Sequence, residues 1–214
     1  MMLRVLVANR KGGCGKTTIA TNLAAAFAAG GLRTALADVD RQHSGLDWLA
    51  LRPPTAAPIM RLDWHKSVDA PPGEVQRLVI DAPAALRMSE VEELVDTADM
   101  VLVPVLPSVF DEGSTRRFVD RLEKLKPVRK GRKPLALVAN RLRAHSCATR
   151  RLEDFLAELA RPVGGRLADR TLYADLGTQG LGLFDLEGRR FGPARAEWQP
   201  LLAMIEGAVP LSPR

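Results

Sequence analysis

Residues 3–18 have the sequence LRVLVANRKGGCGKTT. The apolar run at residues 3–8 predicts a buried strand, and residues 19–29, IATNLAAAFAA, predict a helix. A glycine-rich loop between a strand and a helix lets backbone N–H groups turn toward phosphate oxygens. We therefore predict that residues 11–18 bind the phosphates of a nucleotide.

Each part of this loop has an expected chemical role. Lys16 is placed to neutralise charge on the β- and γ-phosphates, and the Thr17 hydroxyl is placed to ligate Mg²⁺ at the helix N-terminus. The alternative is a glycine-rich turn that binds nothing, but the Gly-Lys-Thr-Thr run stands in register between strand and helix. The predicted phosphate-binding residues are Lys11, Gly12, Gly13, Cys14, Gly15, Lys16, Thr17 and Thr18.

The loop departs from the common pattern G-x-x-x-x-G-K-[ST] at its first position. Arg10 stands where the first glycine is expected, and a second lysine, Lys11, follows it. Residues 11–17 resemble the deviant Walker A loop, K-G-G-x-G-K-[ST], of the ParA/MinD family of ATPases. In that family the first lysine reaches across a dimer interface to the partner's nucleotide. The resemblance implies an ATP-sandwiched homodimer in which Lys11 and Lys16 are catalytic; a solvated loop lysine is the alternative for Lys11.

Two aspartates follow the strand predicted at residues 34–37. Because ligands bind at the carboxyl edge of a parallel sheet, Asp38 and Asp40 are expected beside the phosphate loop. Residues 38–42, DVDRQ, resemble the family's D-x-D-P-Q segment, with Arg41 in place of the usual proline. The resemblance implies that Asp40 orients the attacking water and that Asp38 supports the magnesium shell. Either aspartate could instead cap the following helix.

Two further polar residues end predicted strands. The run LVIDAP at residues 78–83 has the form of a Walker B element, so Asp81 is expected to hold Mg²⁺ through water. This signal is weak alone and gains force from the two matching elements upstream. Asn140 follows the strand predicted at residues 135–139 and resembles the family position that contacts the nucleotide base; the alternative is a turn-forming asparagine.

Short apolar segments alternate with amphipathic ones along the chain, which predicts a doubly wound, mostly parallel α/β sheet with helices on both faces. The resemblance of residues 11–17 implies that this is the P-loop NTPase fold of the deviant Walker A type. A length of 214 residues predicts a single domain, residues 1–214. The predicted strands are residues 3–8, 34–37, 59–62, 78–80, 100–105 and 135–139. The predicted helices are residues 17–29, 44–51, 89–97, 112–125, 149–159 and 194–208. Residues 178–184 are expected to form a mobile loop near the site.

The composition predicts a cytoplasmic protein. Hydrophobic residues make up 46% of the chain, and no apolar run is long enough to span a membrane. Residues 3–8 lead straight into the phosphate loop, so we expect a strand there rather than a signal peptide. Cys14 and Cys147 have no metal-ligand spacing around them and are expected to be free thiols.

The basic residues suggest a polyanionic partner. The net charge is +6 and the sequence pI is 9.8, although such an excess also serves solubility. One basic segment spans residues 124–133. It could contact DNA, or it could be a loop whose charges are simply solvated. A second group supplies our first candidates for contact with DNA phosphates. These candidates are Arg141, Arg143, Arg150 and Arg151.

The family divides by what its ATP-bound dimer binds. ParA-like members bind DNA without sequence preference and move plasmids, chromosomes or protein cargo over the nucleoid, whereas MinD-like members bind membrane. A MinD-like chain should end in an amphipathic basic helix, but residues 208–214, AVPLSPR, contain two prolines that disfavour one. We therefore expect a nucleoid-associated ParA-like ATPase without membrane insertion.

This ATPase is expected to use ATP and Mg²⁺, to form a homodimer with ATP, and to work with a cargo or ATPase-stimulating adaptor protein. Carboxysomes and chemoreceptor clusters are examples of the cargo that compact family members position. Three alternatives remain open. They are a MinD-like positioning ATPase, an ATP-dependent metal-cluster carrier, which would need a C-x-x-C pair, and a small-molecule kinase or synthetase, which would consume a second substrate.

Overall fold

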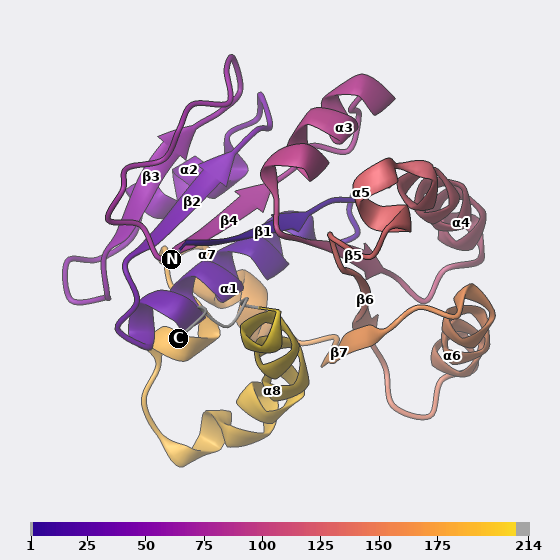
Figure 1. Ribbon diagram of the computed structural model, residues 1–214. Helices are drawn as coiled ribbons and strands as arrows, with labels where there is room; N and C mark the ends of the chain where they lie inside the picture. Colours follow the sequence, from indigo (N-terminus) through magenta and orange to yellow (C-terminus); the bar gives the residue numbers. More distant parts are fainter. Residues whose placement is uncertain (1, 209–214) are drawn as a thin grey trace.

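The computed structural model describes residues 2–208, so most of the proline-containing segment 208–214 lies outside the described residues. Seven parallel strands form one sheet in the order β3-β2-β4-β1-β5-β6-β7 (Figure 1). The strands are β1 (Leu3–Val7), β2 (Thr34–Asp38), β3 (Ile59–Asp63), β4 (Arg77–Asp81), β5 (Met100–Val105), β6 (Leu135–Leu142) and β7 (Val163–Ala168). All six predicted strands are present, and the parallel doubly wound fold is confirmed.

Helices occupy the crossovers between these strands. The helices are α1 (Lys16–Ala29), α2 (Ser44–Ala50), α3 (Met88–Thr97), α4 (Val109–Lys124), α5 (Lys126–Arg129), α6 (Cys147–Leu159), α7 (Leu172–Gly177) and α8 (Gly192–Gly207), with short 3-10 helices η1 (Leu183–Asp185) and η2 (Arg189–Phe191). The six predicted helices match α1, α2, α3, α4, α6 and α8 within a few residues, while α5 and α7 were not predicted. Gly30 and Gly31 follow α1, and Gly31 has a φ of 81°, as expected for a helix stop.

The sheet is covered on both faces by apolar packing. Strands β2, β4 and β5 are buried along their full length, as strands covered on both faces must be. Side chains of α3, α4 and α6 fill one core, and side chains of α1 and α8 fill the other. Because the central strands are parallel, their carboxyl ends meet at one edge of this sheet.

Strand β7 was not predicted from the sequence because it contains two glycines, which are poor strand formers but allow close packing against α8. Its sequence is VGGRLA, and glycine is a poor strand former. A Cβ at Gly164 would lie 2.8 Å from Leu201 Cδ1 of α8, so glycine is what allows α8 to approach the strand. Parallel pairing with the predicted strand β6 holds these residues in the extended conformation.

The segment at residues 178–184, which we expected to be a mobile loop, packs against α1 and α2. The Leu183 N–H donates to Asn22 Oδ1 at 2.8 Å, and Trp48 Nε1 donates to the Leu181 carbonyl at 3.2 Å. A Cβ at Gly182 would lie 2.5 Å from the Ala25 Cβ. The glycine here permits close packing against α1.

Candidate nucleotide-binding site

A cavity of about 260 Å³ opens where the phosphate loop meets the carboxyl edge of the sheet. Strand β1 lies between β4 and β5, and the chain leaves it through the loop before entering α1 at Lys16. The residues that line the cavity come from this loop, from the turns after β2 and β4, and from the end of β6. They are Gly12, Gly13, Gly15, Lys16, Thr17, Thr18, Asp40, Ala82, Ala84 and Arg141. Most of the predicted phosphate-binding residues and Asp40 are thus brought together.

The loop needs glycine at its last position. Gly15 has a φ of 91°, a left-handed conformation that L side chains rarely adopt. A Cβ there would lie 2.2 Å from Asn140 Nδ2. That amide nitrogen donates to the Cys14 carbonyl at 2.9 Å, so buried Asn140 ties the end of β6 to the loop. Contact between Asn140 and a nucleotide base stays a prediction.

Asn9 also anchors the loop, and sequence reasoning missed it. Its side chain is buried, and Nδ2 donates to the Pro104 carbonyl at 2.8 Å and to Thr115 Oγ1 at 3.1 Å. Its Oδ1 accepts the Lys11 N–H at 3.2 Å. Asn9 therefore joins β5, α4 and the loop, and an asparagine between an apolar strand and a glycine run was the available signal.

The two loop lysines have different surroundings. Lys16 is buried, and its Nζ donates to the Lys11 carbonyl at 3.1 Å. Among residues 2–208, no carboxylate pairs with Lys16. A buried ammonium without an anionic partner is costly, because its charge has lost most of its hydration. Lys16 is therefore suited to receive an anion from the cavity.

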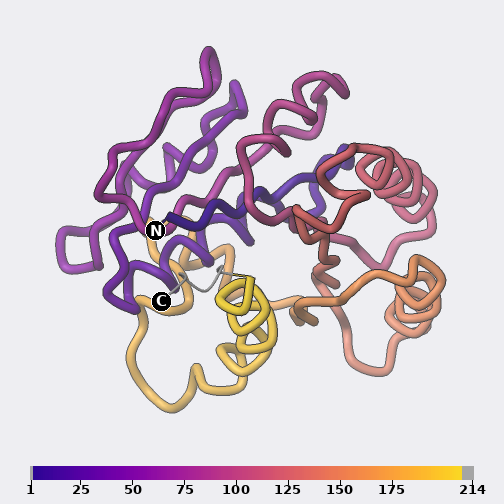
Figure 2. Tube along the Cα trace, in the orientation of Figure 1, coloured from indigo at the N-terminus to yellow at the C-terminus, as the bar shows by residue number. Residues whose placement is uncertain are grey.

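Lys11 instead pairs within its own chain. Its Nζ lies 2.9 Å from Asp111 Oδ1, and the Asp111 side chain is only 6% exposed in the first turn of α4. The loop after β1 and α4 accordingly lie next to one another (Figures 1 and 2). Sequence reasoning missed Asp111 because the two partners are distant in the chain. The Lys11 side chain remains 38% exposed, so it can reach a ligand outside its own chain, and its departure leaves the nearly buried Asp111 carboxylate without a cation.

Asp38 acts as the cap of α2. Its side chain is fully buried: Oδ1 accepts the Asp40 N–H at 2.9 Å, and Oδ2 accepts the N–H groups of Gly45 at 2.8 Å and Leu46 at 3.2 Å. Burial raises the pKa of Asp38, and these backbone hydrogen bonds oppose the rise. Both carboxylate oxygens are therefore engaged by the backbone. The helix-capping alternative is therefore present in the structure, and the supporting role of Asp38 in the magnesium shell stays a prediction.

The turn after Asp38 closes without proline. The His43 N–H donates to the Asp40 carbonyl at 3.0 Å, and exposed Arg41 occupies the turn between them. Asp40 is half-buried, and its Oδ1 accepts the Gln42 N–H at 3.0 Å. The structure thus orients the Asp40 carboxylate at the cavity wall despite the departure from D-x-D-P-Q.

Asp81 fits a divalent cation. The side chain is buried, and its Oδ1 has no hydrogen-bond partner among the described residues. Burial raises the pKa of Asp81 to about 7, while the hydrogen bond from Thr17 opposes that rise. A buried, unpartnered carboxylate oxygen next to a hydroxyl matches the oxygen ligands that Mg²⁺ prefers. Thr17 and Asp81 are therefore the residues suited to hold the ion, directly or through water.

Replacing Asp81 with asparagine is expected to stabilise the nucleotide-free protein above neutral pH. Because the folded-state pKa is raised, between about pH 4 and pH 7 the unfolded chain releases a proton that the folded protein keeps. Wild-type stability therefore falls as pH rises through this window, by about 4 kcal/mol at most. Urea unfolding across the window should show a flatter dependence for Asp81→Asn.

Exposed Asp120 provides the control for this measurement. Asp120→Asn should keep the wild-type pH dependence, whereas Asp81→Asn should also lose stabilisation by Mg²⁺ with nucleotide. Parallel pH profiles for wild type and Asp81→Asn would show that the buried carboxyl does not control this dependence.

The predicted DNA-contacting arginines do not form one free basic face. Arg143 pairs with Asp169 at 2.8 Å, and Arg151 pairs with Glu112 at 3.1 Å. The other two also have local contacts. Arg150 Nη2 donates to Cys147 Sγ at 3.1 Å, and Arg141 lines the nucleotide cavity. All four side chains are at least partly exposed, so contact between them and DNA stays a prediction.

The two cysteines are free thiols, as predicted. Cys14 is buried in the loop, where its Sγ donates to the Lys11 carbonyl at 3.2 Å, and burial raises its pKa. Cys147 is exposed at the start of α6. Of the helices within residues 2–208, none combines the length and the apolar character needed to cross a membrane.

Comparison with known proteins agrees with this geometry. Residues 5–183 match the model of the CobQ/CobB/MinD/ParA nucleotide-binding domain. The chain is 31% identical to the maintenance of carboxysome distribution protein A of Halothiobacillus neapolitanus over 191 residues, which cover 86% of this chain and 87% of that protein.

Two solved structures are similar in fold. An ATP complex of a variant of McdA from Cyanothece has a TM-score of 0.71 at 15% identity, covering 100% of this chain and 98% of that one. The septum site-determining protein MinD of Pyrococcus horikoshii OT3, complexed with Mg-ADP, has a TM-score of 0.66 at 16% identity, covering 99% and 98%. At these identities the structures support the fold alone.

Proposed function

Because the chain belongs to the CobQ/CobB/MinD/ParA family of nucleotide-binding domains, we propose that it is a Mg²⁺-dependent ATPase that positions cargo as an ATP-bound, DNA-binding homodimer. The observation that carries this proposal is the pair of lysines in one loop. Lys16 is buried without a carboxylate partner in the described chain, whereas Lys11 lies at the surface and pairs with Asp111. One lysine is thus suited to its own nucleotide and the other to a nucleotide presented from outside.

The proposed reaction is phosphoryl transfer from ATP to water. Lys16 and the backbone amides of Gly13 and Gly15 bind the phosphates, and Asp40 orients the water that attacks. Thr17 and Asp81 would hold Mg²⁺, which would supply positive charge to offset that of the phosphates. ATP and Mg-ADP are the ligands named for the two structurally similar proteins, and they are the ligands proposed here.

The proposed dimer places Lys11 against the partner's nucleotide. In forming it, Lys11 exchanges Asp111 for phosphate, which substitutes one charge-assisted contact for another. Apolar side chains are exposed beside this pair: Phe110 is 88% exposed and Val109 is 51% exposed at the start of α4. Burial of Phe110 in an interface would supply apolar contact area next to Lys11.

The proposed cargo is a protein assembly reached through an adaptor. This part of the proposal derives from the relative whose name describes the maintenance of carboxysome distribution. Non-specific DNA binding supplies the surface over which such cargo is moved, and the protein is accordingly proposed to associate with the nucleoid. Hydrolysis of ATP then acts as a timer that returns the dimer to monomers.

The DNA-binding part is tested by measuring affinity for random-sequence duplexes as a function of salt. With ATP, the logarithm of the affinity should fall linearly with the logarithm of salt concentration, with a slope of about −0.9 for each phosphate contact. Affinity should change less than about threefold among unrelated sequences, since phosphate contacts carry no sequence information. Strong preference for one operator would instead indicate a sequence-specific regulator.

A further inference from the structure

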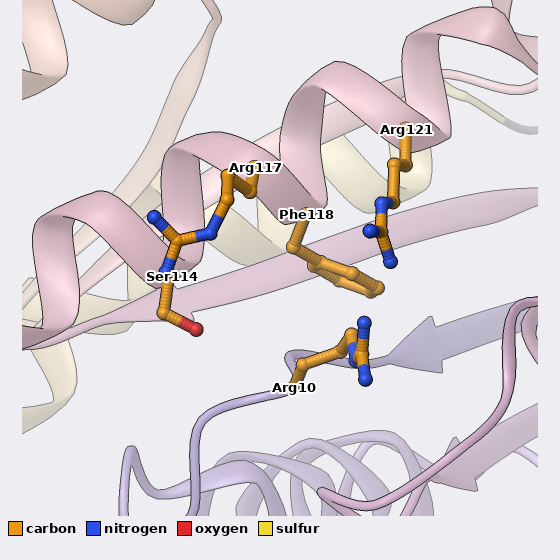
Figure 3. A pocket seen from close by; sticks show the side chains of 5 residues that line it. All are labelled: Arg10, Ser114, Arg117, Phe118 and Arg121. Carbon is orange, nitrogen blue, oxygen red and sulfur yellow. The ribbon is translucent and has the colours of Figure 1, made fainter.

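A second pocket, distinct from the nucleotide cavity, lies between the phosphate loop and α4. It has a volume of about 250 Å³ and is lined by Arg10, Ser114, Arg117, Phe118 and Arg121. Figure 3 shows the guanidinium groups of Arg10 and Arg121 approaching the same space from the loop and from the helix, while Arg117 extends toward Ser114. We call this set of residues the arginine pocket.

The three arginines of the pocket carry charge that the protein does not neutralise. Within the described residues, Arg10, Arg117 and Arg121 form no ion pair. The acidic residues of α4 do not form ion pairs with these arginines. Asp111 pairs with Lys11, Glu112 with Arg151 and Glu123 with Arg161, and Asp120 does not line the pocket. The guanidinium groups of Arg10 and Arg121 approach the same space. Like charges that approach repel one another, so an anion between these two groups is stabilised.

The chemistry of the lining fits a phosphate group. Guanidinium groups donate two parallel hydrogen bonds to phosphate oxygens, and the Ser114 hydroxyl is a further donor. Phe118 is only 1% exposed, so the pocket offers little apolar surface to a base or an apolar side chain. The expected ligand is therefore charged and presents oxygen atoms.

The surroundings of the pocket favour a long polyanion over a small one. Cations at the surface continue from Arg121 to Lys124 at the end of α4 and then along α5 and the turn that follows. In the described chain none of these cations belongs to an ion pair. Those of α5 and the turn are Lys126, Arg129, Lys130 and Arg132. A free phosphate would need the pocket alone, whereas a nucleic-acid backbone would also contact these neighbours.

We propose that the arginine pocket binds a backbone phosphate of duplex DNA, with α4 and α5 as the adjoining DNA-contacting surface. This inference rests on the proposed function, and it places the principal contact away from Arg143 and Arg151, which are ion-paired. Arg10 directly precedes Lys11, and Ser114 lies one turn after Asp111. The pocket therefore adjoins the Lys11–Asp111 pair.

The test is DNA binding by the full-length Arg117→Gln/Arg121→Gln variant with ATP, measured by fluorescence anisotropy of a random-sequence duplex over a range of salt. Affinity should fall roughly a hundredfold, about tenfold for each arginine that no longer donates a charge-assisted hydrogen bond to phosphate. The salt slope should decrease by about two. The matched control is Arg189→Gln/Arg190→Gln, which removes two exposed charges from η2 and should change affinity less than about twofold.

Mass measurements in the same samples separate the possible results. Loss of DNA binding by an intact ATP dimer of the pocket variant, with the control unaffected, supports the proposal. Wild-type affinity in the pocket variant overturns it and leaves the proposed function standing. A pocket variant that fails to dimerise overturns it as well, because the arginines would then act in assembly. A wild-type ATP dimer that ignores DNA overturns both this inference and the DNA-binding part of the proposed function.

Discussion

Lys11→Ala is expected to abolish ATP-dependent dimerisation while leaving ATP binding and the fold in place. The Lys11 side chain contributes no core packing; its ion-pair partner in the described structure is Asp111. Removing a charge-assisted hydrogen bond to phosphate at the centre of an interface should weaken the dimer at least about a hundredfold. Sedimentation or light scattering with ATP should report a monomer, and nucleotide titration should report near-normal ATP affinity.

Two variants control the Lys11 experiment. Asp111→Asn breaks the same ion pair from the other side and keeps the lysine, so this variant should still dimerise. Lys16→Ala removes the buried ammonium and should lose ATP binding itself. A Lys11→Ala protein that dimerises normally with ATP would contradict the role of Lys11 across the interface.

Asp40→Ala is expected to lower ATP hydrolysis by roughly a hundredfold or more, the usual contribution of a positioned general base or water-orienting group. Asp40 lines the cavity between the phosphate loop and the turn after β4, and its carboxylate is oriented by the Gln42 N–H. Because the phosphate-binding residues are untouched, ATP affinity should hold and the dimer should persist. Phosphate release in single-turnover conditions measures the loss.

Asp47 offers a matched control for Asp40, since it is an exposed aspartate in the first turn of α2. Asp47→Ala should hydrolyse ATP at the wild-type rate. If Asp40→Ala also hydrolysed ATP at that rate, the attacking water would have to be oriented by another group.

The sequence predicted most of the fold because strands buried on both faces are continuous apolar runs. Strand β5, MVLVPV, is an example, and it is buried throughout. Strand β7 escaped prediction because Gly164 and Gly165 are present for the close approach of α8, a requirement that arises only in the folded protein. Local composition cannot report a packing partner that lies elsewhere in the chain.

The phosphate loop, in contrast to β7, could be predicted from the sequence. Its function depends on neighbouring residues, so one contiguous motif contains the information. The ion pair between Lys11 and Asp111 depends on how α4 is placed against β1, and the capping of α2 by Asp38 depends on the turn between them. The ion pair could be found only in the three-dimensional structure, whereas capping by Asp38 was one of the alternatives that the sequence left open.

Charge in the sequence likewise did not reveal which basic residues are available. Arg143 and Arg151 lie in a basic segment, yet each pairs with an acidic residue that is distant in sequence. Arg117 and Arg121 lie among acidic neighbours on α4, but the structure directs them into a common pocket with Arg10. Availability for a ligand is set by these pairings rather than by local charge density.

An ATP-dependent dimer that binds DNA should be detected by measuring the mass of the Asp40→Ala protein with ATP and with ADP, each with and without random-sequence duplex DNA. Slowed hydrolysis should trap the active state. We expect a dimer that binds the duplex with ATP, and a monomer that does not bind it with ADP. A monomer with ATP, or an ATP dimer that leaves the duplex unbound, would contradict the account.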